Sequence, residues 1–215
     1  KTAIYIKTRQ KLIDEALESY LPGENEYPRE IHKAMRYSIF TGGKRVRPIL
    51  TLASCEACGG DIKKAMVAAC AVEIVHTYSL VHDDLPAMDD DDYRRGKPTC
   101  HKKFGEGIAV LAGDALLTYA FELLTRGGDP AVNNEIIRSL AEAIGSNGMI
   151  GGQVVDIHDQ ADPDLPTLTY INAHKTGALI SASCKIGALA AKAPKKKIDA
   201  LRRYGEYIGF TFQVV

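Results

Sequence analysis

The sequence lacks an excess of charge of either sign. Its 215 residues include 27 lysines and arginines and 27 aspartates and glutamates, so the formal net charge is zero at pH 7. Without a basic excess, a protein has no global attraction for a nucleic-acid backbone or for an anionic membrane surface. We therefore expect no nucleic-acid partner, and a polyanionic ligand must be bound by a local cluster of cations.

The sequence also lacks the pattern of a disulfide framework. Its five cysteines are an odd number, no signal peptide opens the chain, and the chain is far larger than disulfide-dependent domains. These features predict reduced thiols in a cytoplasmic protein. Cys55 and Cys58 have a C-x-x-C spacing, but no second pair lies at zinc-finger spacing, so helix packing is the favoured interpretation.

Long uncharged runs and alternating patterns are missing as well. Glu73 and Asp114 interrupt the most apolar stretches, which predicts that no segment spans a membrane. No sustained alternation of apolar and polar residues indicates strands. With 46% hydrophobic and 25% charged residues and no internal repeat or long linker, we expect one globular domain across residues 1–215.

Helical periodicity is present instead. Apolar residues from Leu12 to Leu21 recur at helical spacing and stop at Pro22-Gly23. The other expected helices cover residues 28–41, 48–58, 61 to about 83 with Asp61 as N-cap, 107–125, 130–145, 147–160, 168–191 with Thr167 as cap, and 195–215. The predicted fold class is therefore all-α, with the most apolar helices at the centre of a bundle.

The densest charge in the chain follows the helix expected to start at Asp61. Six aspartates precede two arginines, Arg94 and Arg95; they are Asp83, Asp84, Asp89, Asp90, Asp91 and Asp92. Like charges so close repel one another unless a cation lies among them or they point into water. On spacing alone, a metal site and an acidic surface loop with arginine salt bridges are equally good interpretations.

Pro86 indicates how some of these aspartates could share one ion. Its ring disfavours helical dihedrals at the preceding residue, so the helix should end there and let Asp83, Asp84 and Asp89 converge. Carboxylates alone suit Mg²⁺, which is usually held by one or two of them together with substrate phosphates. Neighbouring arginines can give forked hydrogen bonds to the same phosphates.

Cations elsewhere in the chain give this cluster a context. Gly42-Gly43-Lys44 and Arg47 stand at the entrance of a helix, where free N–H groups favour anions. His76 precedes Asp83 by seven residues and so shares its helix face. Lys175-Thr176-Gly177 lies inside an expected helix, where a solvated lysine is the ordinary interpretation.

With these motifs, the chain resembles the trans-type prenyl diphosphate synthases, most closely the bacterial farnesyl diphosphate synthases (geranyltranstransferases). The resemblance covers roughly residues 28–215. It rests on five motifs in the order of that family: residues 42–48, residues 76–99, Gly152 to Asp156, Lys175 to Gly177, and Gly209 to Gln213.

The resemblance implies an isoprenoid-synthase-type helical bundle around a central cavity, a homodimer, and Mg²⁺ as cofactor. The implied reaction is head-to-tail condensation of dimethylallyl or geranyl diphosphate with isopentenyl diphosphate to give farnesyl diphosphate and diphosphate. Carried over by position, the roles are these: Asp83, Asp84 and Asp89 hold Mg²⁺ on the allylic diphosphate; Arg94, Lys175, Thr176 and Gln213 contact the allylic substrate; Lys44, Arg47, His76 and Arg95 bind isopentenyl diphosphate. By the same resemblance, Lys175, Thr176 and Gln213 would also contact the developing cation; Lys175 and Gln213 count, with the three aspartates, as catalytic.

Product length is assigned to Tyr78, with Ser79 beside it. An aromatic residue five positions before the first aspartate, and four residues between Asp84 and Asp89, are associated in the family with a fifteen-carbon product. A helical wheel places Tyr78 well around from Asp83, so a tyrosine packed between helices is the alternative. The alternative functions are a geranylgeranyl diphosphate synthase and a noncatalytic prenyl synthase subunit that reshapes an active partner.

The chain departs from the family at its end. The resemblance implies a second aspartate-rich motif directly after Phe212-Gln213, yet the sequence ends at Val215. We therefore expect that the C-terminal helices of the domain are missing and that the 215-residue chain alone is inactive.

Overall fold

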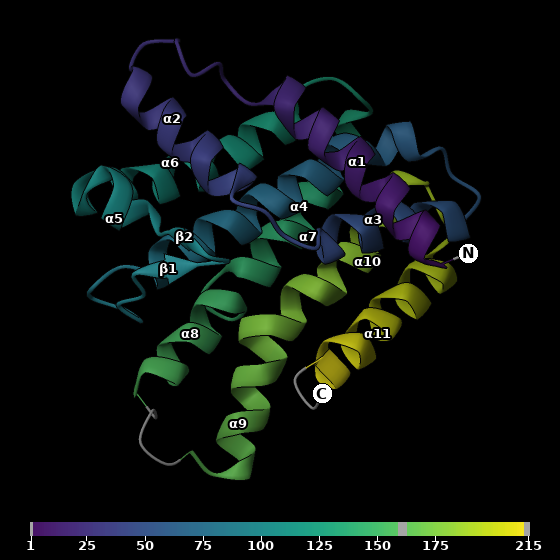
Figure 1. Ribbon diagram of the computed structural model, residues 1–215. Helices are drawn as coiled ribbons and strands as arrows, with labels where there is room; N and C mark the ends of the chain where they lie inside the picture. Colours follow the sequence, from purple (N-terminus) through teal and green to yellow (C-terminus); the bar gives the residue numbers. More distant parts are fainter. Residues whose placement is uncertain (1, 159–162, 213–215) are drawn as a thin grey trace. The chain divides into compact units, whose positions relative to one another are not determined.

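The computed structural model describes residues 2–158 and 163–212, whose regular secondary structure is helical apart from one small hairpin (Figure 1). In chain order the elements are α1 (Thr2–Tyr20), α2 (Arg29–Phe40), α3 (Val46–Ala57), α4 (Ile62–Asp83), β1 (Tyr93–Arg94), β2 (Lys97–Pro98), α5 (Cys100–Phe104), α6 (Glu106–Thr125), α7 (Pro130–Ile144), α8 (Met149–His158), α9 (Leu165–Ile171), the π-helix η1 (Asn172–Gly177), α10 (Ala178–Ala190) and α11 (Lys195–Phe212). The all-α prediction is confirmed.

The described residues form two compact units, each built from two segments of the chain. The first unit comprises Lys1–Arg45 and Glu73–Leu123, and the second comprises Val46–Val72 and Leu124–Val215. Helices α4 and α6 contribute residues to both units. The expectation of one domain across residues 1–215 stays a prediction.

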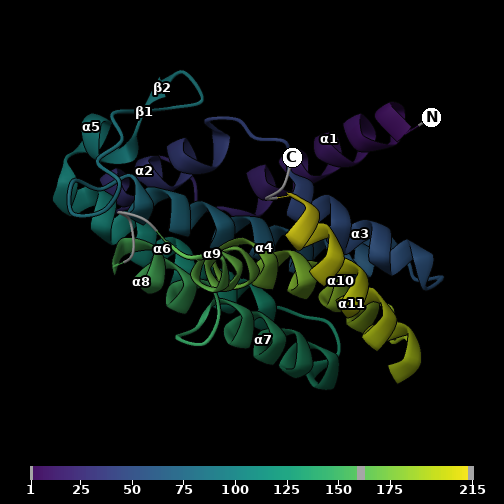
Figure 2. The same ribbon diagram turned by 90° about the horizontal axis from the view of Figure 1, so that it is seen from below.

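In the first unit, α2 packs beside α5 and the hairpin (Figure 2). The Tyr37 hydroxyl of α2 donates a hydrogen bond to the Pro98 carbonyl of β2 at 2.7 Å. Ile13 and Leu17 of α1 and Ile39 of α2 are fully buried, as the periodicity of these helices predicted. The first helix begins at Thr2, earlier than the apolar spacing from Leu12 indicated.

Helix α4 begins and ends where local sequence predicted. The Asp61 carboxylate accepts a hydrogen bond from the Lys63 amide at 2.9 Å, which caps the start of the helix. The helix ends at Asp83, just before Pro86. Residues 68–75 are all buried, so this part of α4 belongs to the core.

Among the residues that the structure describes, two helices are long and apolar enough to cross a membrane, judged by length and composition alone. They are α4 and α6; 67% of the most apolar window of α4 is buried in the structure, against 44% for α6. A buried core helix of a soluble protein passes the same test, so this is weak evidence for a membrane span. The expectation of no span stays a prediction.

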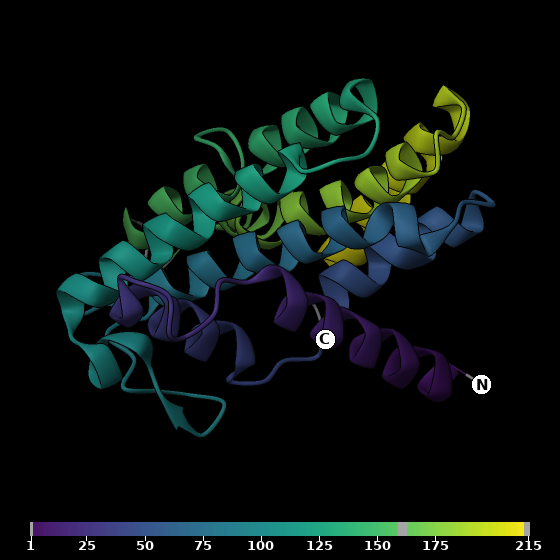
Figure 3. The ribbon, with the colours of Figure 1, turned by 90° about the horizontal axis from the view of Figure 1, so that it is seen from above.

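In the second unit, α10 packs against α3, α7 and α11 (Figure 3). Gly187 permits the close approach of α10 to α3, because an added Cβ would lie 2.1 Å from the Thr51 carbonyl oxygen. Ile180 and Ile186 fill the core on the same helix. Small residues thus let α10 pack closely while its isoleucines supply buried apolar surface.

The prediction of one helix over residues 168–191 with Thr167 as its cap was wrong in its start, its cap and its continuity. The structure divides this stretch into α9, η1 and α10. The cap is Asp164, whose carboxylate accepts a hydrogen bond from the Thr167 amide at 2.9 Å, so Thr167 lies inside the first turn. An aspartate followed by a proline near the helix start was the stronger signal. Helical periodicity alone does not reveal a π-helical turn.

Candidate functional site

The chain reverses direction directly after α4. The Asp89 amide donates a hydrogen bond to the Asp83 carbonyl at 2.9 Å, and the Met88 amide donates to the Leu85 carbonyl at 2.9 Å. On a continuous helix, Asp83 and Asp89 would be separated by about 120°. The predicted break at Pro86 is therefore confirmed, and it brings Asp89 back beside the end of the helix.

Asp84 faces inward from the same turn. Its side chain is buried, and its carboxylate accepts hydrogen bonds from Arg94 Nε at 2.8 Å and Arg94 Nη2 at 2.5 Å. Burial raises the pKa of Asp84, although the hydrogen bond from Arg94 opposes this shift. This ion pair links the residue that follows α4 to strand β1. Their assigned roles toward Mg²⁺ and the allylic diphosphate stay predictions.

The remaining carboxylates of this turn suit a hard cation. Asp83 is half-buried and Asp89 is exposed, and both offer oxygen donors only. Another group, Asp90, Asp92 and His101, has potential ligand atoms within 4.8 Å of one another. Asp92, however, forms an ion pair with Lys102 at 2.7 Å. The donor set of Asp83 and Asp89 therefore fits Mg²⁺ better.

Arg94 and Arg95 belong to a hairpin that the sequence analysis did not foresee. Tyr93 pairs with Pro98 and Arg94 with Lys97, leaving a two-residue turn at Arg95-Gly96. The φ angles of that turn are +54° and +76°, as in a type I′ turn. Strands of two residues show no alternation, so the glycine after Arg95 was the only signal.

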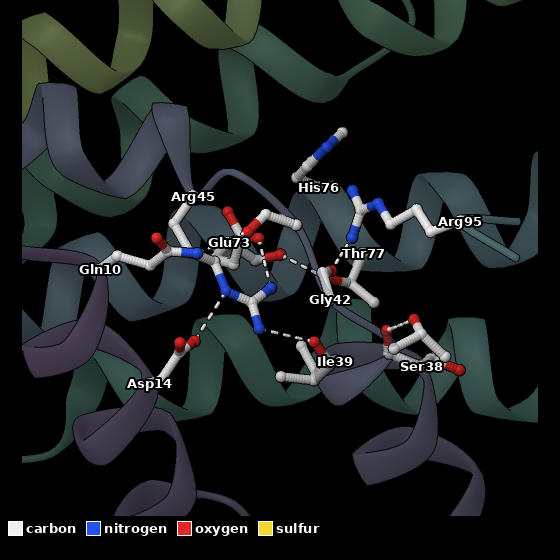
Figure 4. Close-up of polar contacts among 12 residues, drawn as sticks. Gln10, Asp14, Ser38, Ile39, Gly42, Arg45, Glu73, His76, Thr77 and Arg95 are labelled. Carbon is white, nitrogen blue, oxygen red and sulfur yellow. Dashed lines mark hydrogen bonds and ion pairs between the residues drawn. The ribbon is translucent and has the colours of Figure 1, made fainter. Parts of the chain in front are cut away.

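The hairpin places Arg95 against the glycine-rich loop that precedes α3. The guanidinium of Arg95 donates a hydrogen bond to the Gly42 carbonyl (Figure 4). An added Cβ at Gly43 would lie 2.6 Å from Arg95 Nη1, so the absence of a side chain permits this approach. Lys44, next in the loop, is exposed, and His76 lies on the same side of Gly42 as Arg95 (Figure 4). In the first unit, Lys44 thus belongs to the loop that Arg95 contacts, and both residues are assigned to isopentenyl diphosphate.

Tyr78 is buried on α4. Only 5% of it is exposed, and burial raises the pKa of its hydroxyl to about 12. Its ring packs edge-to-face on His82 with centroids 5.8 Å apart, and His82 in turn lies 3.0 Å from the Val110 carbonyl of α6. The Ser79 hydroxyl donates to the His76 carbonyl at 2.9 Å. These contacts describe packing, and the assignment of both residues to product length stays a prediction.

In the second unit, two of the quoted motifs meet. Lys175 Nζ on η1 donates a hydrogen bond to Asp156 Oδ2 on α8 at 2.5 Å. An added Cβ at Gly152 would lie 2.3 Å from the Lys175 amide nitrogen, so glycine lets α8 approach η1. Asp156 had no role among the predicted site residues; a carboxylate four residues after a glycine pair was the available signal. Thr176 follows Lys175 in the π-helix, a feature often found at functional sites.

Arg47 lies in the first turn of α3, within the second unit, and is half-buried. Gln213 lies outside the described residues, so its assignment stays a prediction.

Comparison with known proteins identifies the family. Residues 28–215 match the polyprenyl synthetase family. The chain belongs to this family. It is 50% identical, over 98% of its length, to the heterodimeric geranylgeranyl pyrophosphate synthase large subunit 1, chloroplastic, of Arabidopsis thaliana. It is 48% identical, again over 98% of its length, to the dimethylallyltranstransferase of Fischerella ambigua.

Solved structures agree with this family assignment. The crystal structure of an FPP/GFPP synthase from Zymomonas mobilis matches 99% of the polyprenyl synthetase chain with a TM-score of 0.91 and 41% identity. The chain covers 78% of that protein, 59% of the Arabidopsis relative and 62% of the Fischerella relative. The isoprenoid-synthase fold is therefore shown.

Proposed function

We propose that the protein is a Mg²⁺-dependent prenyltransferase that condenses an allylic diphosphate with isopentenyl diphosphate. The observation that carries this proposal is the turn after α4, where the Asp89 amide binds the Asp83 carbonyl at 2.9 Å. It places two carboxylates at the end of one helix, next to a hairpin with two arginines. Membership of the polyprenyl synthetase family supports the same reaction.

The roles of the residues follow from their chemistry. Asp83 and Asp89 would hold Mg²⁺, which neutralises charge on the departing diphosphate when bound. Arg95 and Lys44 would bind the diphosphate of isopentenyl diphosphate through charge-assisted hydrogen bonds. Arg94 would exchange its contact with Asp84 for the allylic diphosphate. The reaction then requires positioning of two substrates and no protein nucleophile.

Lys175 is proposed to act beside the allylic fragment. Loss of diphosphate would leave an allylic cation, which the double bond of isopentenyl diphosphate would attack. The new carbocation formed by this C–C bond would then lose a proton to the released diphosphate. Asp156 holds the Lys175 ammonium at 2.5 Å, which restricts where this charge can point. Thr176 and Gln213 complete the proposed contacts to the allylic substrate.

Two products are proposed. Farnesyl diphosphate is favoured by Tyr78, a bulky side chain five positions before Asp83. Geranylgeranyl diphosphate is favoured by the relatives, since those of Arabidopsis thaliana and Cyanophora paradoxa carry that product in their names. The difference is one five-carbon unit, which a single aromatic side chain can exclude.

Product chromatography tests the reaction and the product. The protein as its gene encodes it is incubated with Mg²⁺, isopentenyl diphosphate and either dimethylallyl or geranyl diphosphate. We expect a fifteen-carbon product from the wild type and longer products from Tyr78→Ala. A twenty-carbon product from the wild type would favour the second candidate. Absence of any elongated product under these conditions would refute the proposed reaction.

A homodimer in the cytoplasm completes the proposal. The name of the Arabidopsis relative describes a heterodimeric large subunit, which makes a partner chain the alternative assembly. Light scattering on the purified protein distinguishes them, because a homodimer needs no second chain. A noncatalytic subunit would stay inactive alone and would gain activity only with its partner.

A further inference from the structure

Two neighbouring cations, Lys44 and Arg45, lie in opposite environments. Lys44 is exposed, whereas Arg45 is only 4% exposed and has a φ of +51°. A residue with a side chain adopts this left-handed conformation only when its surroundings compensate for the strain. The contacts of the buried guanidinium should therefore explain why Arg45 turns inward.

The guanidinium of Arg45 joins three helices (Figure 4). Its Nε donates to Asp14 Oδ1 of α1 at 2.8 Å and its Nη1 donates to Glu73 Oε1 of α4 at 2.7 Å. Its Nη2 donates to the Ile39 carbonyl near the end of α2 at 2.7 Å. The arginine fork presents donors on three nitrogens in a fixed plane, which matches three acceptors on separate helices, whereas a lysine concentrates its donors on one nitrogen.

These contacts lie at the end of the glycine-rich loop. Gly42 and Gly43 have φ angles of +106° and +147°, a region that most other residues avoid. Two more side chains hold the loop from outside: Gln10 Nε2 donates to the Gly43 carbonyl at 2.9 Å, and Arg95 donates to the Gly42 carbonyl. A glycine pair is intrinsically flexible, so such anchors decide its conformation.

The buried pair also acts electrostatically on Arg95. Burial lowers the pKa of Arg95; the negative charge of Glu73 opposes this shift, and the positive charge of Arg45 adds to it. Arg95 therefore senses both members of the pair. Without Arg45, the buried carboxylate of Glu73 would lack its compensating charge and would attract Arg95.

We propose that Arg45 and Glu73 are positioning residues for diphosphate binding. The pair holds the loop that carries Lys44 and neutralises Glu73, which leaves the guanidinium of Arg95 to the substrate. Neither residue touches the substrate, so both act through Lys44 and Arg95. This inference rests on the proposed function, since isopentenyl diphosphate is the ligand assigned to these two cations.

Steady-state kinetics on four variants test the proposal. Arg45→Met alone leaves a buried carboxylate and can fail to fold, so the decisive variant is Arg45→Met/Glu73→Leu, which removes both charges. We expect its KM for isopentenyl diphosphate to rise about 10- to 100-fold, as for a displaced binding group, with kcat and the KM for geranyl diphosphate within about threefold. Arg45→Lys should give a smaller increase. Asp14→Asn is the matched control, because it removes a charge from the same guanidinium without uncovering Glu73.

The kinetic outcomes separate positioning from general stability. If the double variant regains wild-type stability and wild-type KM together, the pair is only structural and the proposal is overturned. A fall in kcat together with a rise in the KM values for both substrates would also overturn it. An increase in the KM for isopentenyl diphosphate alone, in a protein with wild-type thermal stability, supports it.

Hydrogen exchange supplies a readout that does not depend on activity. The amides of residues 42–45 should exchange about tenfold faster in the double variant than in Asp14→Asn, because an anchor of the loop is lost. Unchanged exchange would overturn the inference, whatever the kinetics. If the wild type does not condense the two diphosphates, the proposed function fails, and exchange then decides alone whether Arg45 holds the loop.

Discussion

Helix α4 carries carboxylates in two contrasting regions. Glu73, in its middle, is 3% exposed and forms an ion pair with Arg45 at 2.7 Å. Asp83, at its end, opens a turn that leads to the exposed residues Asp89 and Asp90. Ten residues along one helix thus separate a fully enclosed anion from an acidic, water-facing turn.

The difference indicates what each region can do. A buried carboxylate needs a permanent partner, since desolvation without compensation would destabilise the fold. Exposed carboxylates keep their hydration, and a cation can replace that hydration when substrate arrives. The middle of α4 therefore suits positioning, and its end suits metal binding. The predictions below test this contrast, in order of decreasing effect.

The largest effect is expected at the buried pair. Arg45→Met should lower the free energy of unfolding by about 3–5 kcal/mol, because it leaves Glu73 buried without its cation. Urea denaturation measures this change. Adding Glu73→Leu should restore most of the loss, since no buried charge then remains. A loss below about 1 kcal/mol in the single variant would show that Glu73 reaches water easily, and the contrast would fail.

The exposed turn should respond in activity rather than stability. Asp83→Asn and Asp89→Asn should each lower kcat/KM by about 10²- to 10³-fold, the range for loss of one electrostatic stabiliser. The free energy of unfolding of Asp89→Asn, at an exposed residue, should stay within about 0.5 kcal/mol of the wild type. Removal of Mg²⁺ with a chelator should abolish turnover, and added Mg²⁺ should restore it.

Asp90→Asn is the matched control for the turn. Its φ of +50° is one that asparagine tolerates, so the backbone should not change. Activity should stay near the wild-type value. An equal loss in this variant would contradict the specific assignment of Asp83 and Asp89, because total acidity of the turn would then be what matters.

The pKa of Tyr78 tests whether the buried environment of Glu73 continues along α4 toward Asp83. Burial raises the pKa of its hydroxyl from 10.0 to about 12, so between these pH values the folded protein retains a proton that the unfolded chain has lost. Its contribution to stability is complete below pH 10 and is lost as the pH rises toward 12. At pH 11 the loss should be about 1 kcal/mol.

Paired pH titrations of unfolding measure this contribution. Tyr78→Phe should remove it. The comparison variant is Tyr93→Phe, which deletes the hydroxyl of a hairpin tyrosine that is 69% exposed. If the free energy of unfolding depended on pH equally in the wild type and in Tyr78→Phe, burial would not affect the Tyr78 hydroxyl.

The smallest effect is expected at an exposed ion pair. Arg138 and Glu142 lie one turn apart on α7 at 3.1 Å, with 69% and 59% of their side chains exposed. Arg138→Ala should change the free energy of unfolding by only about 0.3–0.5 kcal/mol. The same urea series measures both variants. If Arg138→Ala lowered the free energy of unfolding as much as Arg45→Met, burial would not explain the contrast between the two ion pairs.

Several elements were predictable from local sequence. Helices α2, α6 and α7 lie close to their expected bounds, because apolar periodicity, proline and glycine act within a few residues. The π-helix and the hairpin were not predictable. The hairpin strands are two residues long, and the π-helix covers only six residues around Lys175, which is too short to change the apolar periodicity.

By itself, the sequence determined the all-α class, the end of α4 before Pro86, and the motifs that identify the family. These follow from local sterics, periodicity and residue order. Only the tertiary structure decided which charges are paired. Arg45 donates hydrogen bonds to acceptors on three separate helices, and Arg94 of the hairpin donates to Asp84 at the end of α4. The partner of a buried charge depends on which groups lose water in the same place, and this is decided only when distant segments pack.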